Sequence, residues 1–176
     1  AVNLARIKDD LIINFQGDAP LTPPHFVANL INTMKADNSI NVATPILQCD
    51  KKHYLKLLDE RGNNRVGATT VVFDNNYDAL YFSKEVLPFI TKESISKLET
   101  LPVYHHVGVY AYKNEILSQY KDWEETDLEK VESLEQIRFL QNNIKVRCLL
   151  MENNESNFWE LNNPSDKKII ERILKS

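Results

Sequence analysis

The strongest constraint on the fold is the largely apolar run at residues 11–15, which ends in Gln-Gly-Asp-Ala-Pro at residues 16–20. An apolar run of this length needs burial, which excludes a surface loop and predicts a strand. The strand cannot continue past Pro20, because proline has no N–H to donate to a sheet. Asp18 therefore lies just beyond the carboxyl end of a predicted strand.

The position of Asp18 is compatible with a ligand site. In open α/β sheets, ligands bind in the crevice beyond the carboxyl ends of the strands. A carboxylate held there by a turn can bind a hydrated magnesium ion. The alternative is that Gly17 and Asp18 form only a turn, in which Asp18 acts as a cap for the approaching helix. The residues alone leave both interpretations open.

The segments that follow alternate between helix and strand patterns. A helix is expected after Pro23 and Pro24, since proline suits the first turn and apolar residues then recur on one stripe. Residues 40–46 predict the next strand and residues 52–58 a short helix. Two successive strand–helix steps favour a parallel sheet.

A β-hairpin is expected next, because two β-rich runs, 66–73 and 79–83, flank an Asn/Asp-rich turn at 74–78. The remaining chain predicts a strand at 104–112, helices at 114–120 and 127–140, a strand at 144–151 and a final helix that opens at Pro164. In the helix at 127–140, four apolar residues recur at helical spacing and are expected to face the core: Leu128, Val131, Leu134 and Ile137.

Composition limits the classes of protein to consider. A chain of 176 residues with 43% hydrophobic residues can form one substantial core, so residues 1–176 are expected to be a single domain. The formal charge of -4 gives no basic surface for nucleic acid or an anionic membrane. No apolar run approaches the roughly 18 residues of a membrane span.

The two cysteines also exclude some classes of site. Cys49 and Cys148 are far apart in the sequence and have no CxxC or Cys/His companion. This arrangement excludes the common zinc patterns and gives no disulfide framework, so a reducing cytoplasm is expected.

Four segments, taken in order, resemble a known family. They are Gln-Gly-Asp at 16–18, Ala-Leu-Tyr-Phe-Ser-Lys at 79–84, the segment 106–112 and the segment 128–138. Their order and spacing resemble those of the 3-deoxy-manno-octulosonate (Kdo) cytidylyltransferases, or CMP-Kdo synthetases, which are related to the acylneuraminate cytidylyltransferases. The resemblance runs from about residue 11 to the end of the chain.

This resemblance implies an α/β fold like that of the nucleotide-diphospho-sugar transferases. The expected sheet is mixed and mainly parallel, is flanked by helices and carries the β-hairpin as an excursion. The fold is expected to be incomplete at its N-terminus, because nothing before Leu11 resembles the family's first strand and basic, proline-containing phosphate loop.

The resemblance also implies an activity, namely transfer of CMP from CTP to Kdo or a related sugar acid, with release of pyrophosphate. It implies a Mg²⁺ cofactor, a homodimer and a role in lipopolysaccharide synthesis in the cytoplasm. The chemistry of the residues agrees with this activity, since phosphoryl-type transfer depends on charge neutralisation and in-line positioning, which a metal ion and basic groups supply.

Three site residues follow from the first two segments of the resemblance. Asp18 corresponds to the family's magnesium ligand, and Gln16 lies beside it at the nucleotide and sugar site. Lys84 stands where the family usually has an arginine that meets the sugar carboxylate. Lysine keeps the positive charge but loses the bidentate geometry of arginine. The alternative for Lys84 is a solvated lysine at the end of a strand.

Further sugar contacts are implied on the strand at 104–112. Adjacent strand residues point to opposite faces, so His105 and His106 cannot bind one metal ion together. The resemblance selects His106, with Tyr110 on the same face. The alternative is that His106 is a hydrogen-bonded core histidine.

Glu135 and Gln136 match a Leu-Glu-Gln helix turn of the family that hydrogen-bonds sugar hydroxyls. A solvated helix face is the alternative for both. Arg138 is expected to pair with a carboxylate, either that of the ligand or that of Glu135.

The chain departs from the family pattern at two positions. Asn162 stands where the family has a second carboxylate for the metal, and a neutral carbonyl is a poorer ligand for a hard cation. Ala19 stands where the family usually has glutamate. A second hypothesis is therefore a catalytically inactive or partner-dependent relative that binds a sugar acid or acts as an assembly module. The third is an α/β domain with a diverged ligand.

Overall fold

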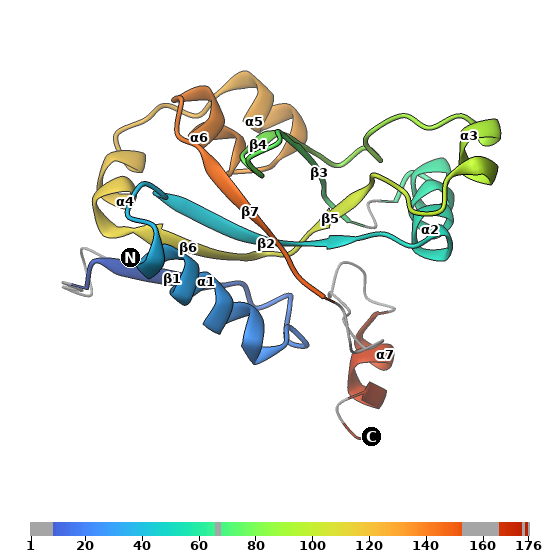
Figure 1. Ribbon diagram of the computed structural model, residues 1–176, viewed down its shortest axis with the longest axis horizontal. Helices are drawn as coiled ribbons and strands as arrows, with labels where there is room; N and C mark the ends of the chain where they lie inside the picture. Colours follow the sequence, from blue (N-terminus) through green and yellow to red (C-terminus); the bar gives the residue numbers. More distant parts are fainter. Residues whose placement is uncertain (1–8, 66–67, 153–165, 174, 176) are drawn as a thin grey trace.

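Helices cover both faces of a seven-stranded sheet in the computed structural model, which describes residues 9–65, 68–152, 166–173 and 175 (Figure 1). The elements in chain order are β1 (Leu11–Phe15), α1 (Pro24–Ala36), β2 (Val42–Gln48), α2 (Lys51–Gly62), β3 (Thr70–Phe73), β4 (Ala79–Ser83), α3 (Lys92–Lys97), β5 (Tyr104–His106), β6 (Val109–Lys113), α4 (Asn114–Tyr120), α5 (Asp127–Glu132), α6 (Ile137–Gln141), β7 (Val146–Leu150) and α7 (Asp166–Ile173).

The expectation of a mainly parallel sheet is wrong. The strand order is β1-β6-β2-β5-β3-β4, with β7 paired to β2. The β2–β7 pairing is parallel, whereas the other pairings among the described strands are antiparallel. Both β1 and β2 pair with β6 in the antiparallel sense, so they share a direction without touching. The strand–helix alternation indicated this shared direction but not that a distant strand lies between the two.

The predicted β-hairpin is confirmed. β3 and β4 pair in antiparallel fashion, and the turn between them closes through a 2.9 Å hydrogen bond from the N–H of Asp74 to the carbonyl of Asp78. The Asp78 carboxylate then binds two basic side chains, Arg147 of β7 at 2.7 Å and Lys145 at 2.9 Å. These ion pairs fasten the tip of the hairpin to β7.

The core follows the two-residue period of the strands. On β2, Ala43 and Leu47 pack in the cluster formed with α1, whereas Val42 and Ile46 pack in the cluster that contains residues of α4 and α6. Figure 1 shows α1 on one side of the sheet and α5 and α6 on the other. The helix predicted after the two prolines is confirmed, because α1 begins at Pro24 and buries an apolar stripe: Phe26, Leu30 and Met34.

Two predicted elements are interrupted. The strand expected at 104–112 stops at His106 and resumes at Val109 as β6. The helix expected at 127–140 is broken at Ser133, whose φ of 51° and ψ of 47° place it in the left-handed region. As a consequence, Val131 is 83% exposed and Leu128 43% exposed, which contradicts their predicted place in the core. Leu134 and Ile137 are buried as expected.

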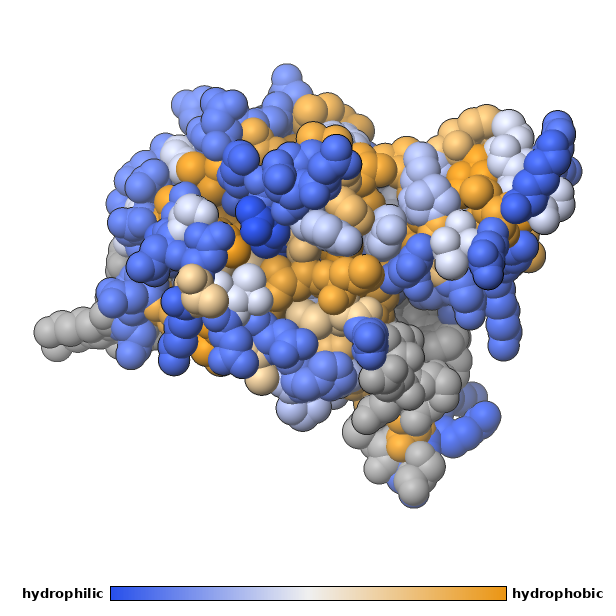
Figure 2. Space-filling model, in the orientation of Figure 1, coloured by the Kyte–Doolittle hydropathy of each residue, from blue (hydrophilic) through white to orange (hydrophobic). Residues whose placement is uncertain are grey.

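The surface mixes polar and apolar residues on the face drawn in Figure 2. A hydrophobic area lies near the centre of this face, where Figure 1 places the C-terminal part of β7. Leu150, the last residue of β7, is 47% exposed. Among the described helices, none has both the length and the apolar character that crossing a membrane requires.

Candidate functional site

A cavity of about 360 Å³ opens beyond the carboxyl end of β1. Its lining comes from separate parts of the chain: Gln16, Asp18, Ala68, Thr69, Lys84, His106, Gly108, Tyr110, Ser133, Leu134, Glu135 and Gln136. Every predicted site residue that lies in the described part of the chain is among them. Asn162, the predicted second metal ligand, lies outside the described residues. The structure thus brings the predicted residues together, and their individual roles stay predictions.

Asp18 lies in an exposed turn directly after β1. The turn is closed by a 3.2 Å hydrogen bond from the N–H of Ala19 to the carbonyl of Gln16. The alternative that Asp18 caps the next helix is wrong, because Pro23 holds the N-cap position of α1 and no side chain caps that helix. The Asp18 carboxylate has no hydrogen bond or ion pair with another described residue, so its oxygens are available to a ligand.

Gly108 makes room for the side chain of Gln16. The N–H of Gln16 donates a 3.4 Å hydrogen bond to the carbonyl of Gly108. A Cβ atom at position 108 would overlap with Oε1 of Gln16 and lie 3.3 Å from its Cδ. The glycine is therefore needed for this position of the Gln16 carboxamide. Gly108 was not among the predicted site residues, since one glycine within a strand pattern is a weak signal.

A buried hydrogen-bond network fixes the ring of His106. Oγ1 of Thr44 lies 3.0 Å from Nε2 of His106, and the Thr44 hydroxyl reaches the carbonyls of Val109 at 2.9 Å and Val107 at 3.2 Å. A hydroxyl has a single hydrogen to donate. With that hydrogen on a carbonyl, Oγ1 accepts from an N–H at Nε2 of His106.

Two aromatic rings pack against His106. Its centroid lies 5.2 Å from the ring of Phe82 and 5.2 Å from that of Tyr110. His105 instead packs edge-on against His53 of α2, with centroids 5.4 Å apart. The two histidines thus belong to different clusters, which confirms that they point to opposite faces. His106 is buried and hydrogen-bonded, as the alternative of a core histidine predicts. It also lines the cavity, so the two interpretations are compatible.

Lys84 follows the last residue of β4, where its N–H donates a 2.9 Å hydrogen bond to Oε2 of Glu132. Its side chain is partly exposed and forms no ion pair with a described residue. The ammonium charge is therefore available to an anionic ligand. Glu132 was not among the predicted site residues, because its partners at the end of β4 are far away in the sequence.

Gln136 is only 4% exposed, which excludes a solvated position for this side chain. Its carboxamide forms no hydrogen bond within the described part of the chain, although it lines the cavity. Glu135 is exposed, and its carbonyl accepts a 3.2 Å hydrogen bond from the Tyr120 hydroxyl. The pair thus combines one buried amide with one exposed carboxylate at the same edge of the cavity.

Arg138 does not take part in the pocket, so its expected pairing with a ligand or with Glu135 is wrong. Its guanidinium binds the buried carboxylate of Glu129 in a bidentate pair, with Nε 2.6 Å from Oε2. The same guanidinium lies 4.5 Å from the centroid of the Tyr120 ring. Arg138 therefore joins α5 to α6 around the break at Ser133.

The chemistry of the pocket suits a polar, anionic ligand with many hydroxyl groups. Amides, an imidazole and a phenol supply neutral donors and acceptors, and Lys84 supplies a positive charge. The described residues contain no group of three or more His, Cys, Asp or Glu side chains that could hold a metal ion. The exposed carboxylate of Asp18 nevertheless fits Mg²⁺, which keeps several waters and is usually bound through few carboxylates together with phosphates of the substrate.

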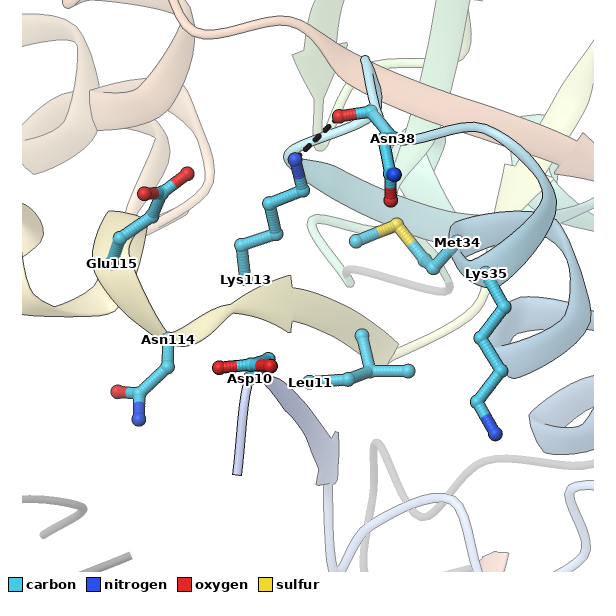
Figure 3. Close-up of a pocket in the computed structure, with 8 residues that line it drawn as sticks. All are labelled: Asp10, Leu11, Met34, Lys35, Asn38, Lys113, Asn114 and Glu115. Carbon is cyan, nitrogen blue, oxygen red and sulfur yellow. Dashed lines mark hydrogen bonds between the residues drawn. The ribbon is translucent and has the colours of Figure 1, made fainter. Parts of the chain in front are cut away.

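A second cavity of about 470 Å³ lies at the opposite end of β1. Figure 3 shows that the side chains around this cavity do not converge on one point. Lys113 turns toward the Asn38 carbonyl, and Lys35 points away from the other residues drawn. The backbone N–H of Asn114 donates a 2.8 Å hydrogen bond to the carbonyl of Asp10, so these two polar groups are already paired with each other. The cavity beyond the carboxyl end of β1 is therefore the stronger candidate.

Comparisons with known proteins agree on one family. Residues 1–146 match the family model described as cytidylyltransferase. A 3-deoxy-manno-octulosonate cytidylyltransferase of Maricaulis maris is 37% identical over 174 residues, which cover 99% of this chain and 66% of that protein. An 8-amino-3,8-dideoxy-manno-octulosonate cytidylyltransferase of Shewanella pealeana is 33% identical over 172 residues, or 97% of this chain and 64% of that protein.

A solved structure has the same fold. It is a CMP:2-keto-3-deoxy-manno-octonic acid synthetase in complex with CTP, superimposed with a TM-score of 0.79 at 25% identity. The match covers 98% of this chain and 65% of that one. The fold is thus of the nucleotide-diphospho-sugar transferase type, and the chain spans about two thirds of the length of these relatives.

Proposed function

The chain belongs to the cytidylyltransferase family, and we propose that it acts in the transfer of CMP from CTP to a 3-deoxy sugar acid such as Kdo, with release of pyrophosphate. We propose the cavity beyond β1 as the site of the sugar acid. The observation that carries this proposal is the meeting of Asp18, Lys84, His106 and Gln136 around one cavity, although they come from four distant parts of the chain.

The pocket residues suggest how a sugar acid would be held. Lys84, whose ammonium has no described ion-pair partner, is proposed to bind the carboxylate of the sugar. The buried carboxamide of Gln136 and the carboxylate of Glu135 are proposed to bind its hydroxyls. Because the two relatives named above act on sugars that differ by one amino group, Kdo is proposed as a representative of the substrate class.

Asp18 is proposed as a ligand of Mg²⁺, with Asn162 as a second ligand and Gln16 beside the ion. Magnesium, when bound, would neutralise charge on the phosphates of CTP as pyrophosphate leaves. The contribution of the chain is to present the Asp18 carboxylate in an exposed turn at the mouth of the cavity. The homodimer, the cytoplasmic location, the single-domain organisation and the role in lipopolysaccharide synthesis remain predictions from the resemblance and the composition.

The proposal is tested by mixing the protein with CTP, Kdo and Mg²⁺ and measuring pyrophosphate release. Release that requires all three components supports it, and Asp18→Ala is expected to lower the rate by at least about a hundredfold, the size of effect usual for a lost metal contact or catalytic charge. Asp122→Ala is the matched control, because Asp122 is exposed and pairs only with its neighbour Lys121 in the described residues.

Calorimetry with Kdo separates the remaining outcomes. Binding of Kdo without pyrophosphate release would contradict CMP transfer by this chain and support the hypothesis of a sugar-acid-binding module. Absence of both binding and release would overturn the assignment of the cavity as well.

A further inference from the structure

Glu132 connects two walls of the pocket without lining it. It is the last residue of α5, immediately before the turn at 133–136 that forms one wall. Its Oε1 accepts hydrogen bonds from the hydroxyl of Ser83 at 2.7 Å and from that of Tyr81 at 3.3 Å. Its Oε2 accepts from the N–H of Lys84 at 2.9 Å. Both carboxylate oxygens are thus directed to the end of β4.

The bond to Lys84 reaches the backbone at the point where the chain leaves the sheet. After Ser83, the strand can no longer position the chain through its own ladder. The Ser83 hydroxyl also accepts a 2.9 Å hydrogen bond from the N–H of Glu85, so the residues on both sides of Lys84 belong to the same network. The Glu132 carboxylate therefore fixes where the Lys84 side chain starts.

Charge strengthens this network. Hydrogen bonds to an ionised acceptor are roughly twice as strong as those between neutral groups. Two further charged groups lie beside the network, since Arg61 of α2 binds the Glu85 carboxylate, and the pKa of Arg61 is raised mainly by Glu85 and in addition by the nearby Glu132. The Glu132 carboxylate thus lies among hydrogen-bond donors from β4 and from Lys84, with the Arg61 guanidinium nearby.

We infer that Glu132 is a positioning residue of the sugar-acid site, which sets the separation between Lys84 on one wall and the Glu135–Gln136 turn on the other. The inference rests on the proposed function, because it assigns Lys84 to the carboxylate of the ligand. Glu132 does not touch the cavity, so it acts through Lys84 and through the turn that follows it. We therefore expect Glu132 to affect how strongly the site prefers a ligand with a carboxylate over the same ligand without that charge.

Glu132→Gln is the most informative change, because it preserves the size of the side chain. A carboxamide has one acceptor oxygen, whereas the carboxylate uses two. The glutamine can thus accept either from Ser83 and Tyr81 or from the N–H of Lys84, but not from both sides. Glu99→Gln is the matched control, since Glu99 is exposed and has no hydrogen bond or ion pair among the described residues.

The experiment compares the affinity for Kdo with that for its neutral methyl ester by calorimetry. The unmodified protein is expected to bind the acid more tightly than the ester. The ratio of the two affinities is expected to fall at least tenfold in Glu132→Gln and to stay unchanged in Glu99→Gln. A purely structural role would weaken both ligands equally, so an unchanged ratio in Glu132→Gln overturns the inference. Failure of the unmodified protein to bind Kdo would instead overturn the proposed function.

Two further measurements apply if Glu132→Gln does not fold. Tyr81→Phe and Ser83→Ala each remove one donor to Oε1 and are expected to reduce the preference for the acid by a smaller factor, about threefold. An unchanged ratio in both overturns the inference. Amide hydrogen exchange of the Lys84 N–H in the unmodified protein, which needs no ligand, is expected to be slow, and rapid exchange at that amide would contradict the bond on which the inference stands.

Discussion

Oγ1 of Thr44 lies 3.0 Å from Nε2 of His106, and both side chains are buried. The Thr44 hydroxyl also forms hydrogen bonds to the carbonyls of Val107 and Val109, the residues on either side of Gly108. One side chain thus contacts both the ring of His106 and the backbone at the break between β5 and β6.

Thr44→Val keeps the shape of this side chain and removes its hydroxyl. The variant is expected to lose about 1–3 kcal/mol in its free energy of unfolding, since the buried partners of the hydroxyl are left unsatisfied. Urea denaturation measures this loss, and the ¹⁵N shifts of the His106 ring report whether the Nε2–H form is still dominant. Exposed Thr100→Val is the control, with an expected change within about 0.5 kcal/mol. Equal stability of the two variants would contradict the assigned network.

Gly108→Ala is expected to displace the Gln16 carboxamide and weaken Kdo binding by about tenfold, the equivalent of one hydrogen bond to a charged ligand. The free energy of unfolding is expected to change little, because the displaced atoms form the end of a flexible side chain. Gly62→Ala is the control, since a Cβ there meets nothing within 4 Å. In a Gln16→Ala background, Gly108→Ala should have no further effect on calorimetric affinity; a persistent effect would show that it does not act through Gln16.

Glu129→Ala removes one partner of the buried ion pair with Arg138 and is expected to cost about 3–5 kcal/mol in the free energy of unfolding. Glu93→Ala provides the comparison, because its pair with Lys97 is exposed and should contribute about 0–1 kcal/mol. Guanidinium denaturation of both variants distinguishes them. Similar midpoints would mean that Arg138 does not hold α5 against α6.

Burial raises the pKa of both cysteine thiols, Cys49 and Cys148, to about 12. The thiolate is the form that reacts with alkylating agents. Because the raised pKa favours the protonated thiol at all pH values below it, neither cysteine of the folded protein is expected to react with iodoacetamide near neutral pH. Mass spectrometry should find two modified cysteines per chain only after unfolding. Rapid modification of the folded protein would show that the burial is not maintained in solution.

Local patterns predicted much of the fold because their causes are local. The apolar strand at residues 11–15, the helix that begins at Pro24 and the hairpin around residues 74–78 each depend on the conformational preferences of neighbouring residues. The sheet order does not, since β6 enters between β1 and β2 from far along the chain. The break at Ser133 also escaped prediction, because a serine in the left-handed region is held there by its surroundings rather than by its own preference.

The candidate site was found through the family resemblance rather than through periodicity. The resemblance grouped Asp18, Lys84 and His106, which the structure places around one cavity. It did not identify Thr44 or Glu132, whose importance lies in contacts with residues distant in the sequence. The expected partners of Arg138 were a ligand carboxylate and Glu135, and Glu129 was not among them, because the break at Ser133 that brings α5 against α6 was not predicted.

The cavity draws its lining from segments that approach one another only when the sheet is complete. A small molecule that contacts several of these segments therefore binds only the folded chain. Its binding raises the free energy of unfolding by an amount that depends on its concentration relative to its Kd. At a concentration one hundred times its Kd, such a molecule would add about 2.7 kcal/mol. Melting temperature can thus rank candidate sugar acids before any turnover has been observed.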